Sequence, residues 1–209
     1  MARNEVKWGA ILSYVLIIFN AVYGLIIAPF ILSSIGNSEY GVYKTIGSMT
    51  ASLAVLDLGL GATVQRYIAK YKAKNEEQTA SNFSAMAFLQ AGVLAFVTAL
   101  VSIGLYFSLN SVYGKSFTEF ELFRAKQIFI VQAIYMVCHI FENIFAGIIA
   151  GNNKFVFSNT VKIISLIIKI SLYCIFLPIF KNSLVIAVVA LLLEFMIIGI
   201  EFISATCRL

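Results

Sequence analysis

Charged side chains are scarce in this sequence. Only 12% of its 209 residues are Asp, Glu, Lys or Arg, whereas 61% are hydrophobic and the mean hydropathy is +0.94. A soluble domain is about one quarter charged, so this composition argues against a soluble fold. It predicts a polytopic, all-helical membrane protein.

Proline, tryptophan and histidine are also rare. Two prolines and one tryptophan argue against a disordered or loop-rich chain, and one histidine cannot build a multi-histidine zinc site. We therefore expect no metal centre and no other cofactor. The three cysteines, Cys138, Cys174 and Cys207, lie in apolar segments, and their odd number indicates no disulfide framework.

Long apolar runs are what the sequence has in abundance. A helix needs about 20 mostly apolar residues to cross a hydrocarbon core roughly 30 Å thick. Six runs meet this requirement, and their length and lack of strict alternation exclude membrane strands. The predicted helices cover residues 9–32, 41–64, 83–109, 126–150, 159–179 and 184–205. The first is too long for the apolar region of a signal peptide, and no connector is long enough for a catalytic domain.

Lysine and arginine residues near the helix ends predict the orientation. Eight flank the side that carries both termini and the connector 65–82: Arg3, Lys7, Arg66, Lys70, Lys72, Lys74, Lys154 and Arg208. Five flank the opposite side: Lys44, Lys115, Arg124, Lys126 and Lys181. Because cytoplasmic loops carry an excess of such residues, we predict a protein of the cytoplasmic membrane with both termini in the cytoplasm.

Seven ionisable residues fall inside the predicted helices, where such residues are costly and usually face a cavity or a partner. They are Asp57, His139, Glu142, Lys162, Lys169, Glu194 and Glu201.

Lys162 and Lys169 are seven residues apart and share one helix face, and Glu194 and Glu201 repeat this spacing on the next helix. If the two faces meet, Lys162 could pair with Glu201 and Lys169 with Glu194, which would hold the two helices together. A second hypothesis places both lysines on an aqueous cavity, where they attract an anionic substrate. Snorkelling, mainly of Lys162, is a third.

His139 and Glu142 are neighbours three residues apart on one helix. They form either an interhelical hydrogen bond or a proton or cation site. Since histidine titrates near neutrality, such a pair could couple transport to an ion gradient. Glu194 is a further candidate for this coupling, or it holds one of the ion pairs above.

Asp57 is the only aspartate, and it lies in an apolar run just before the basic connector. Gly59 and Gly61 permit close helix approach or local unwinding, so Asp57 either caps a broken helix or pairs with a cation. Pro29 lies late in the first predicted helix and indicates a bend, a helix end or a hinge that shapes a cavity.

Residues 29–74 resemble a known family. The stretch reads PFILSSIGNSEYGVYKTIGSMTASLAVLDLGLGATVQRYIAKYKAK. Its late proline, the short turn IGNSEYGVY, and then LDLGLG and RYIAKY look like the N-terminal signature of the Wzx-type polysaccharide flippases. These are O-antigen and capsule repeat-unit translocases of the MATE-like MOP exporter superfamily.

The resemblance implies a flippase for undecaprenyl-diphosphate-linked oligosaccharides. Such proteins work by ion-coupled alternating access between two similar lobes. Residues 1–209 would form one six-helix lobe, with the second lobe absent from this chain. We expect the N-terminal half of a longer protein or a truncated reading frame, in preference to a half-transporter that acts as a dimer.

The resemblance also implies roles for several residues. Lys162 and Lys169 would hold the diphosphate in the cavity, and Arg66 and Lys70 would collect it at the cytoplasmic interface. Gly59 and Gly61 would let the end of the second helix pack tightly. The expected partners are the lipid-linked oligosaccharide, membrane lipids and polysaccharide polymerase or assembly proteins, with no nucleic acid.

Three other function classes stay open. An ion-coupled exporter of drug-like cations fits less well, because the net charge of +5 favours an anionic substrate. A non-transporting scaffold of a polysaccharide assembly complex is the second. A membrane enzyme such as a polyprenyl-phosphate transferase needs carboxylate clusters for magnesium. The chain has one aspartate and no paired acids apart from Glu76 and Glu77, which lie in a connector, so we expect no enzyme.

Overall fold

The computed structural model describes residues 2–57 and 59–206, with the side chains of residues 7–57 and 59–204. Cys207 and Arg208, and the side chain of Arg3, lie outside this part. Its elements are α1 (Ala2–Ile35), α2 (Asn37–Ala51), the 3₁₀ segment η1 (Ser52–Asp57), α3 (Leu60–Ala73), α4 (Glu77–Tyr113), α5 (Glu119–Gly151), α6 (Phe155–Phe180) and α7 (Ser183–Thr206). Six helical stretches are long and apolar enough to cross a membrane, with α2–α3 counted as one. The prediction of an all-helical chain with six spans is confirmed.

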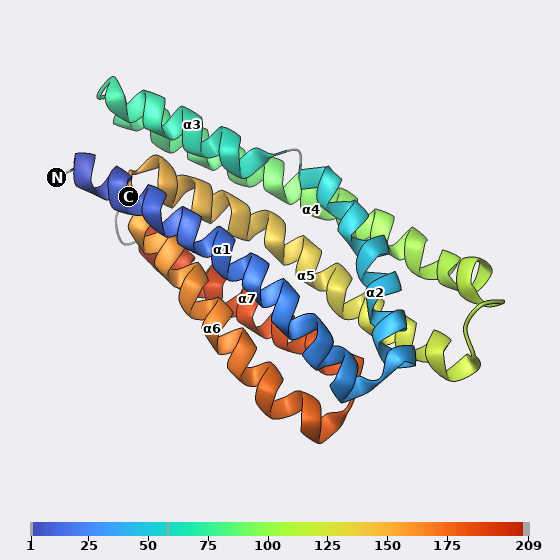
Figure 1. The fold of residues 1–209 in the computed structure, drawn as a ribbon. Coiled ribbons are helices and arrows are strands. Elements are labelled where there is room, and N and C mark those ends of the chain that lie inside the picture. The colour runs from blue at the N-terminus through green and yellow to red at the C-terminus, as the bar shows by residue number, and fades with distance from the viewer. Residues whose placement is uncertain (1, 58, 207–209) are drawn as a thin grey trace.

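The helices form an elongated bundle with α5 near its middle (Figure 1). The start of α1, the end of α3 and the end of α7 lie at one end, which we call the terminal end (Figure 1). The turns from α1 to α2 and from α6 to α7 lie at the other, which we call the far end. The side that the lysine and arginine counts assign to the cytoplasm is the terminal end.

The predicted second helix is interrupted, and the predicted connector after it is largely helical. Between α2 and α3 the chain passes through η1, and Gly59 has a φ of 68°, a left-handed conformation that glycine adopts without strain. Helix α3 then continues to Ala73, so a connector over 65–82 is wrong. Burial of Val64 and Ile68 stabilises this basic helix, because their apolar face packs while the cations stay exposed.

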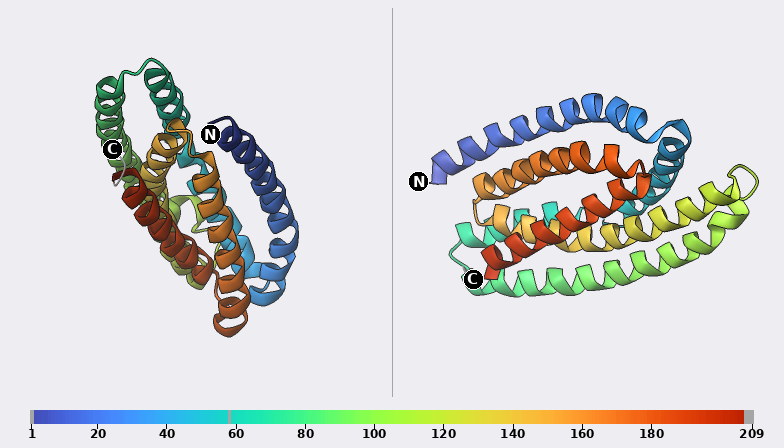
Figure 2. Two further views of the ribbon diagram at one scale, coloured as in Figure 1. Left: turned by 90° about the vertical axis from the view of Figure 1, so that its left-hand side faces the viewer. Right: turned by 90° about the horizontal axis from the view of Figure 1, so that it is seen from below.

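Pro29 does not end the first helix. Helix α1 continues past it to Ile35, and Figure 2 shows α1 curving along its length. The Pro29 ring is exposed at the bundle surface. The structure therefore favours the predicted bend over a helix end at this residue.

Three apolar clusters hold the bundle together. The first joins α3, α4 and α5, the second joins α1, α6 and α7, and the third joins α2, α4, α5 and α7. Helices α1 and α3 thus belong to different clusters. Near the terminal end they lie on either side of α5 (Figure 1).

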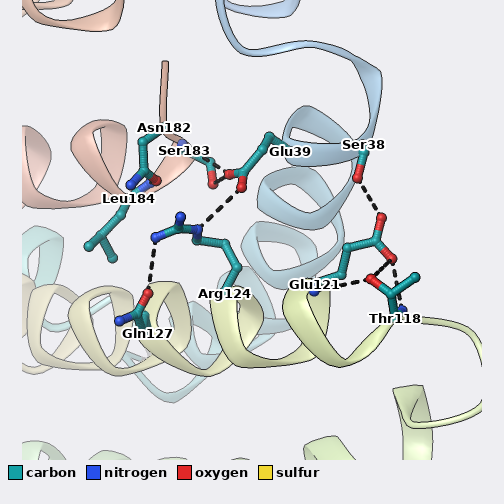
Figure 3. A network of polar contacts seen from close by, with 9 residues as sticks. All are labelled: Ser38, Glu39, Thr118, Glu121, Arg124, Gln127, Asn182, Ser183 and Leu184. Atoms are coloured by element: carbon teal, nitrogen blue, oxygen red, sulfur yellow. Dashed lines mark hydrogen bonds and ion pairs between the residues drawn. The ribbon is translucent and has the colours of Figure 1, made fainter. Parts of the chain in front are cut away.

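Polar contacts tie three helices at the far end (Figure 3). A carboxylate oxygen of Glu39 on α2 accepts a hydrogen bond from Arg124 Nε on α5 at 3.2 Å. Its other oxygen accepts from the backbone N–H of Ser183 at 3.2 Å and from the Ser183 hydroxyl, at the start of α7. Nearby, Thr118 and Glu121 form a capping box that begins α5.

Candidate functional site

A polar cleft is lined along its whole length by α5, with α1, α6 and α7 at one part of it, α1, α3 and α6 at a second, and η1 at a third. It consists of three neighbouring cavities of about 270, 340 and 90 Å³. Each pair of cavities shares one lining residue: Lys162 between the first and second, His139 between the first and third, and Asn143 between the second and third. We call these three cavities together the polar cleft.

The first cavity gathers five of the seven ionisable residues that the sequence places inside helices. They are His139 and Glu142 from α5, Lys162 and Lys169 from α6, and Glu194 from α7. The predicted anion-binding lysines and the predicted ion-coupling residues therefore share one cavity. Their roles stay predictions, since the geometry shows only that they meet.

Short contacts join these groups. His139 Nδ1 lies 2.8 Å from Glu194 Oε1 and 3.5 Å from Glu142 Oε2. Lys162 Nζ lies 2.9 Å from Glu142 Oε1. The Glu142 and Glu194 side chains are 3% and 6% exposed, against 32% for Lys162 and 37% for His139. The carboxylates thus form the base of the cavity, and the nitrogen groups lie above them at its surface.

A tight turn sets the level of the Lys162–Glu142 pair. Helix α5 ends at Gly151 and α6 begins at Phe155, and Asn153 adopts a φ of 60°, which asparagine tolerates better than most residues. Counting at 1.5 Å per residue, both side chains lie roughly 10–14 Å along their helices from this turn. The antiparallel helices therefore present them to each other.

The pairs of Lys162 with Glu201 and of Lys169 with Glu194 are not the ones that the structure shows. Lys162 is paired with Glu142, and Lys169 Nζ lies 5.9 Å from the centroid of the Tyr23 ring on α1. Glu201 accepts a hydrogen bond from the Ser158 hydroxyl at 3.4 Å. The prediction compared only the last two helices, whereas α1 and α5 supply the closer partners.

Tyr135 and Asn20 are among the residues of the first cavity that were missed from the sequence. The Tyr135 ring stacks on the His139 ring, with centroids 5.6 Å apart and planes 13° apart. It lies four residues before His139 on the same face of α5, a spacing that could have indicated it. Asn20 of α1 also lines the cavity, but no pattern in its apolar surroundings points to this.

The second cavity has small and uncharged polar walls. Gly61 and Gln65 on α3, and Ala146 and Gly147 on α5, line one side, and Asn159 lies on α6 opposite. The Asn159 amide donates hydrogen bonds to the carbonyl of Gly9 and to the Ser13 hydroxyl, at 2.9 and 2.8 Å. Lys162 supplies the charged group of this cavity.

Asp57 lies at the third cavity, and its partner is an amide. The Asn143 side chain donates a hydrogen bond to Asp57 Oδ2 at 3.4 Å, and Oδ1 is buried without a hydrogen-bond partner. In the part of the chain that the structure describes, Asp57 forms no ion pair, so pairing with a cation is wrong. Nor does it cap α3, whose N-cap residue is Gly59, with no side-chain hydrogen bond.

Arg66 and Lys70 lie apart from these cavities. Both are exposed on α3, and neither lines any of the three. Lys70 Nζ lies 5.8 Å from the Tyr67 ring centroid. The structure does not bring them together with Lys162 and Lys169.

Comparison with known proteins gives one relative. No family model and no solved structure matches the chain. A Salmonella typhimurium LT2 protein described as "Putative O-antigen transporter" is 25% identical over 125 residues, which cover 58% of this chain and 26% of that protein. The match thus spans about a quarter of the relative's length. The six helices able to span a membrane, together with this likeness to a protein described as a transporter, indicate a multi-pass membrane protein.

Proposed function

We propose that this chain is one lobe of a MATE-like flippase. It would move undecaprenyl-diphosphate-linked oligosaccharides across the cytoplasmic membrane during polysaccharide synthesis. The observation that carries the proposal is the polar cleft, which places Lys162 and Lys169 on one cavity inside a bundle of apolar helices. Support also comes from the distant relative, which is described as an O-antigen transporter. A second lobe would close the cleft on its open side.

In this proposal the two lysines bind the diphosphate. An ammonium group forms strong, charge-assisted hydrogen bonds with phosphate oxygens. Both lysines reach the cleft from one face of α6, and Lys162 borders the larger second cavity as well. The uncharged polar walls of that cavity, with Gln65 and Asn159, suit the hydroxyl groups of a sugar.

The same proposal gives His139, Glu142 and Glu194 the coupling role. An ion gradient would drive alternating access, and these three groups lie within 4.8 Å of one another. Arg66 and Lys70 would collect the lipid diphosphate at the membrane surface before it enters the cleft. Transport would involve no chemical reaction, and polysaccharide polymerase or assembly proteins would receive the flipped lipid.

A flippase-null strain tests this function. We expect the full-length protein to restore surface polysaccharide, and Lys169→Met to reduce it at least tenfold while the protein still reaches the membrane. Lys72→Met is the matched control, because Lys72 is exposed on α3, and it should restore polysaccharide fully. Failure of the unmodified protein to complement any flippase-null strain would refute the proposal and favour a scaffold.

One observation favours a second candidate. The buried glutamates Glu142, Glu194 and Glu201 outnumber the two lysines of the cleft, and carboxylates are what an exporter of drug-like cations requires. Resistance assays separate the two functions. A cation exporter would raise tolerance to lipophilic cations, and Glu194→Gln would abolish that tolerance without changing surface polysaccharide.

A further inference from the structure

Lys162 is already paired with a carboxylate of the protein itself. Its ammonium lies 2.9 Å from Glu142 Oε1, and the glutamate side chain is only 3% exposed. An incoming diphosphate would therefore meet a cation whose charge is balanced. To bind a phosphate oxygen, the ammonium must either break its contact with Glu142 or contact Glu142 and the phosphate at the same time.

The charged groups around Lys162 make that exchange unfavourable while the acids are ionised. Helix α5 contributes His139 and Glu142, α7 contributes Glu194 and Glu201, and α6 adds Lys169. On α1 and α3 the facing polar groups are uncharged, namely Ser13, Asn20 and Gln65. Three carboxylates thus surround the two ammonium groups and the imidazole. The carboxylates repel a diphosphate while they are ionised, and low-dielectric surroundings strengthen the repulsion.

Glu142 differs from the other two acids in its partner. Glu194 receives the 2.8 Å contact of His139 Nδ1, and Glu201 bonds the Ser158 hydroxyl. Among the described residues, Glu142 is the carboxylate within ion-pair distance of a cleft lysine. Its second oxygen lies 3.5 Å from Nδ1 of the partly exposed His139 imidazole, and both residues line the first cavity.

We propose that Glu142 is an internal counter-ion that competes with the substrate diphosphate for Lys162, so that diphosphate binding requires uptake of a proton by the Glu142 carboxylate. The proton converts Glu142 to the neutral acid, and Lys162 keeps its charge and turns to the phosphate. Because Lys162 borders both the first and the second cavity, its ammonium can reach a ligand in either. This inference rests on the proposed function, which makes Lys162 an anion site.

The consequence is a defined link between anion binding and pH. Uptake of one proton on binding makes the affinity fall about tenfold for each unit by which the pH rises. By the reciprocity of linked equilibria, the bound anion also favours protonation of Glu142. Replacement of Glu142 by the uncharged glutamine should then strengthen anion binding at high pH, the opposite of what loss of a binding residue does.

Binding of farnesyl-diphosphate N-acetylglucosamine to the full chain in nanodiscs tests this. The probe is a diphosphate diester, so its own charge stays constant between pH 6 and 8. We expect the affinity of the unmodified chain to fall about a hundredfold over these two pH units, with about one proton taken up, as calorimetry in buffers of different ionisation enthalpy would show. Glu142→Gln should bind equally at both pH values, and at pH 8 at least tenfold more tightly than the unmodified chain.

Two further variants separate this inference from the function beneath it. Glu201→Gln removes a buried charge of the same cluster without removing the partner of Lys162, and it should keep the pH dependence. Lys162→Met should abolish binding at both pH values. If Lys162→Met abolishes binding but Glu142→Gln keeps the pH dependence, Glu142 is not the competitor and only the inference fails.

If Lys162→Met binds like the unmodified chain, or nothing binds at any pH, the anion site itself is misplaced and the proposed function fails with the inference. Should Glu142→Gln not fold, the calorimetry of the unmodified chain still decides. Binding without proton uptake would overturn the proposal.

Discussion

Gly61 and Gly147 set the distance between α3 and α5. A Cβ atom at Gly147 would lie 2.5 Å from the Gly61 carbonyl oxygen, and one at Gly61 would lie 2.6 Å from the Asn143 carbonyl oxygen. Backbone atoms cannot yield as a flexible side chain can, so the helices would have to separate. These two glycines therefore fix the wall of the second cavity, which both of them line.

Substitution of Gly147 by alanine tests this contact. We expect Gly147→Ala to destabilise the protein by about 1–3 kcal/mol, the usual cost of overpacking, and to lower the melting temperature in detergent. Gly104→Ala on α4 is the matched control, because no atom lies within 4 Å of its Cβ position. Since alanine favours a helix over glycine, that variant should be unchanged or more stable. Equal melting temperatures for the two variants would contradict the close approach.

At the scale of elements, the bundle is fixed differently at its two ends. The Glu39 network joins α2, α5 and α7 at the far end (Figure 3). Toward the terminal end, α1 packs on α6, whereas α3 packs on α4 and α5. The second cavity of the polar cleft lies between α1 and α3. The sequence places Glu39 in a turn, but nothing in its spacing indicates contacts with residues 85 and 144 positions away.

The Glu39 carboxylate should be important for this far-end arrangement. Glu39→Gln leaves Arg124 without its ion pair, and both side chains are less than one fifth exposed. We expect a loss of about 1–3 kcal/mol of stability, because the partly buried Arg124 guanidinium would lose its charged hydrogen-bond partner. A double-mutant cycle with Arg124→Gln measures the coupling. A coupling energy near zero would show that the pair does not hold the helices.

On the scale of the whole molecule, the number of spans was predictable and the arrangement of the polar groups was not. The length of an apolar run can be read from the sequence without knowing what the run packs against. The apolar runs alone therefore predict six helices. The partner of Lys162 depends on how α5 is rotated against α6. Glu201 was predicted from its depth in the membrane, and depth gives no information on the rotation of a helix. The amphipathic helix after Gly59 was missed because its many cationic residues are typical of a loop beside the membrane.

Orientation in the membrane is a prediction for the whole molecule. The excess of lysine and arginine predicts that the terminal end faces the cytoplasm. After replacement of the natural cysteines, Asn75→Cys, in the turn between α3 and α4, should react with a membrane-impermeant maleimide only in permeabilised cells. Lys115→Cys, in the turn between α4 and α5, should react in intact cells. The reverse pattern would invert the assignment.

The shared lining residues of the polar cleft have a kinetic consequence. Each pair of cavities shares one lining side chain, that of Lys162, His139 or Asn143, and rotamer changes of accessible side chains take picoseconds to nanoseconds. Collective movements of helices and domains take microseconds to milliseconds. In the proposed transporter, rearrangement of these shared side chains would therefore be complete within each opening of the cleft, and movement of the helices would limit the rate of turnover.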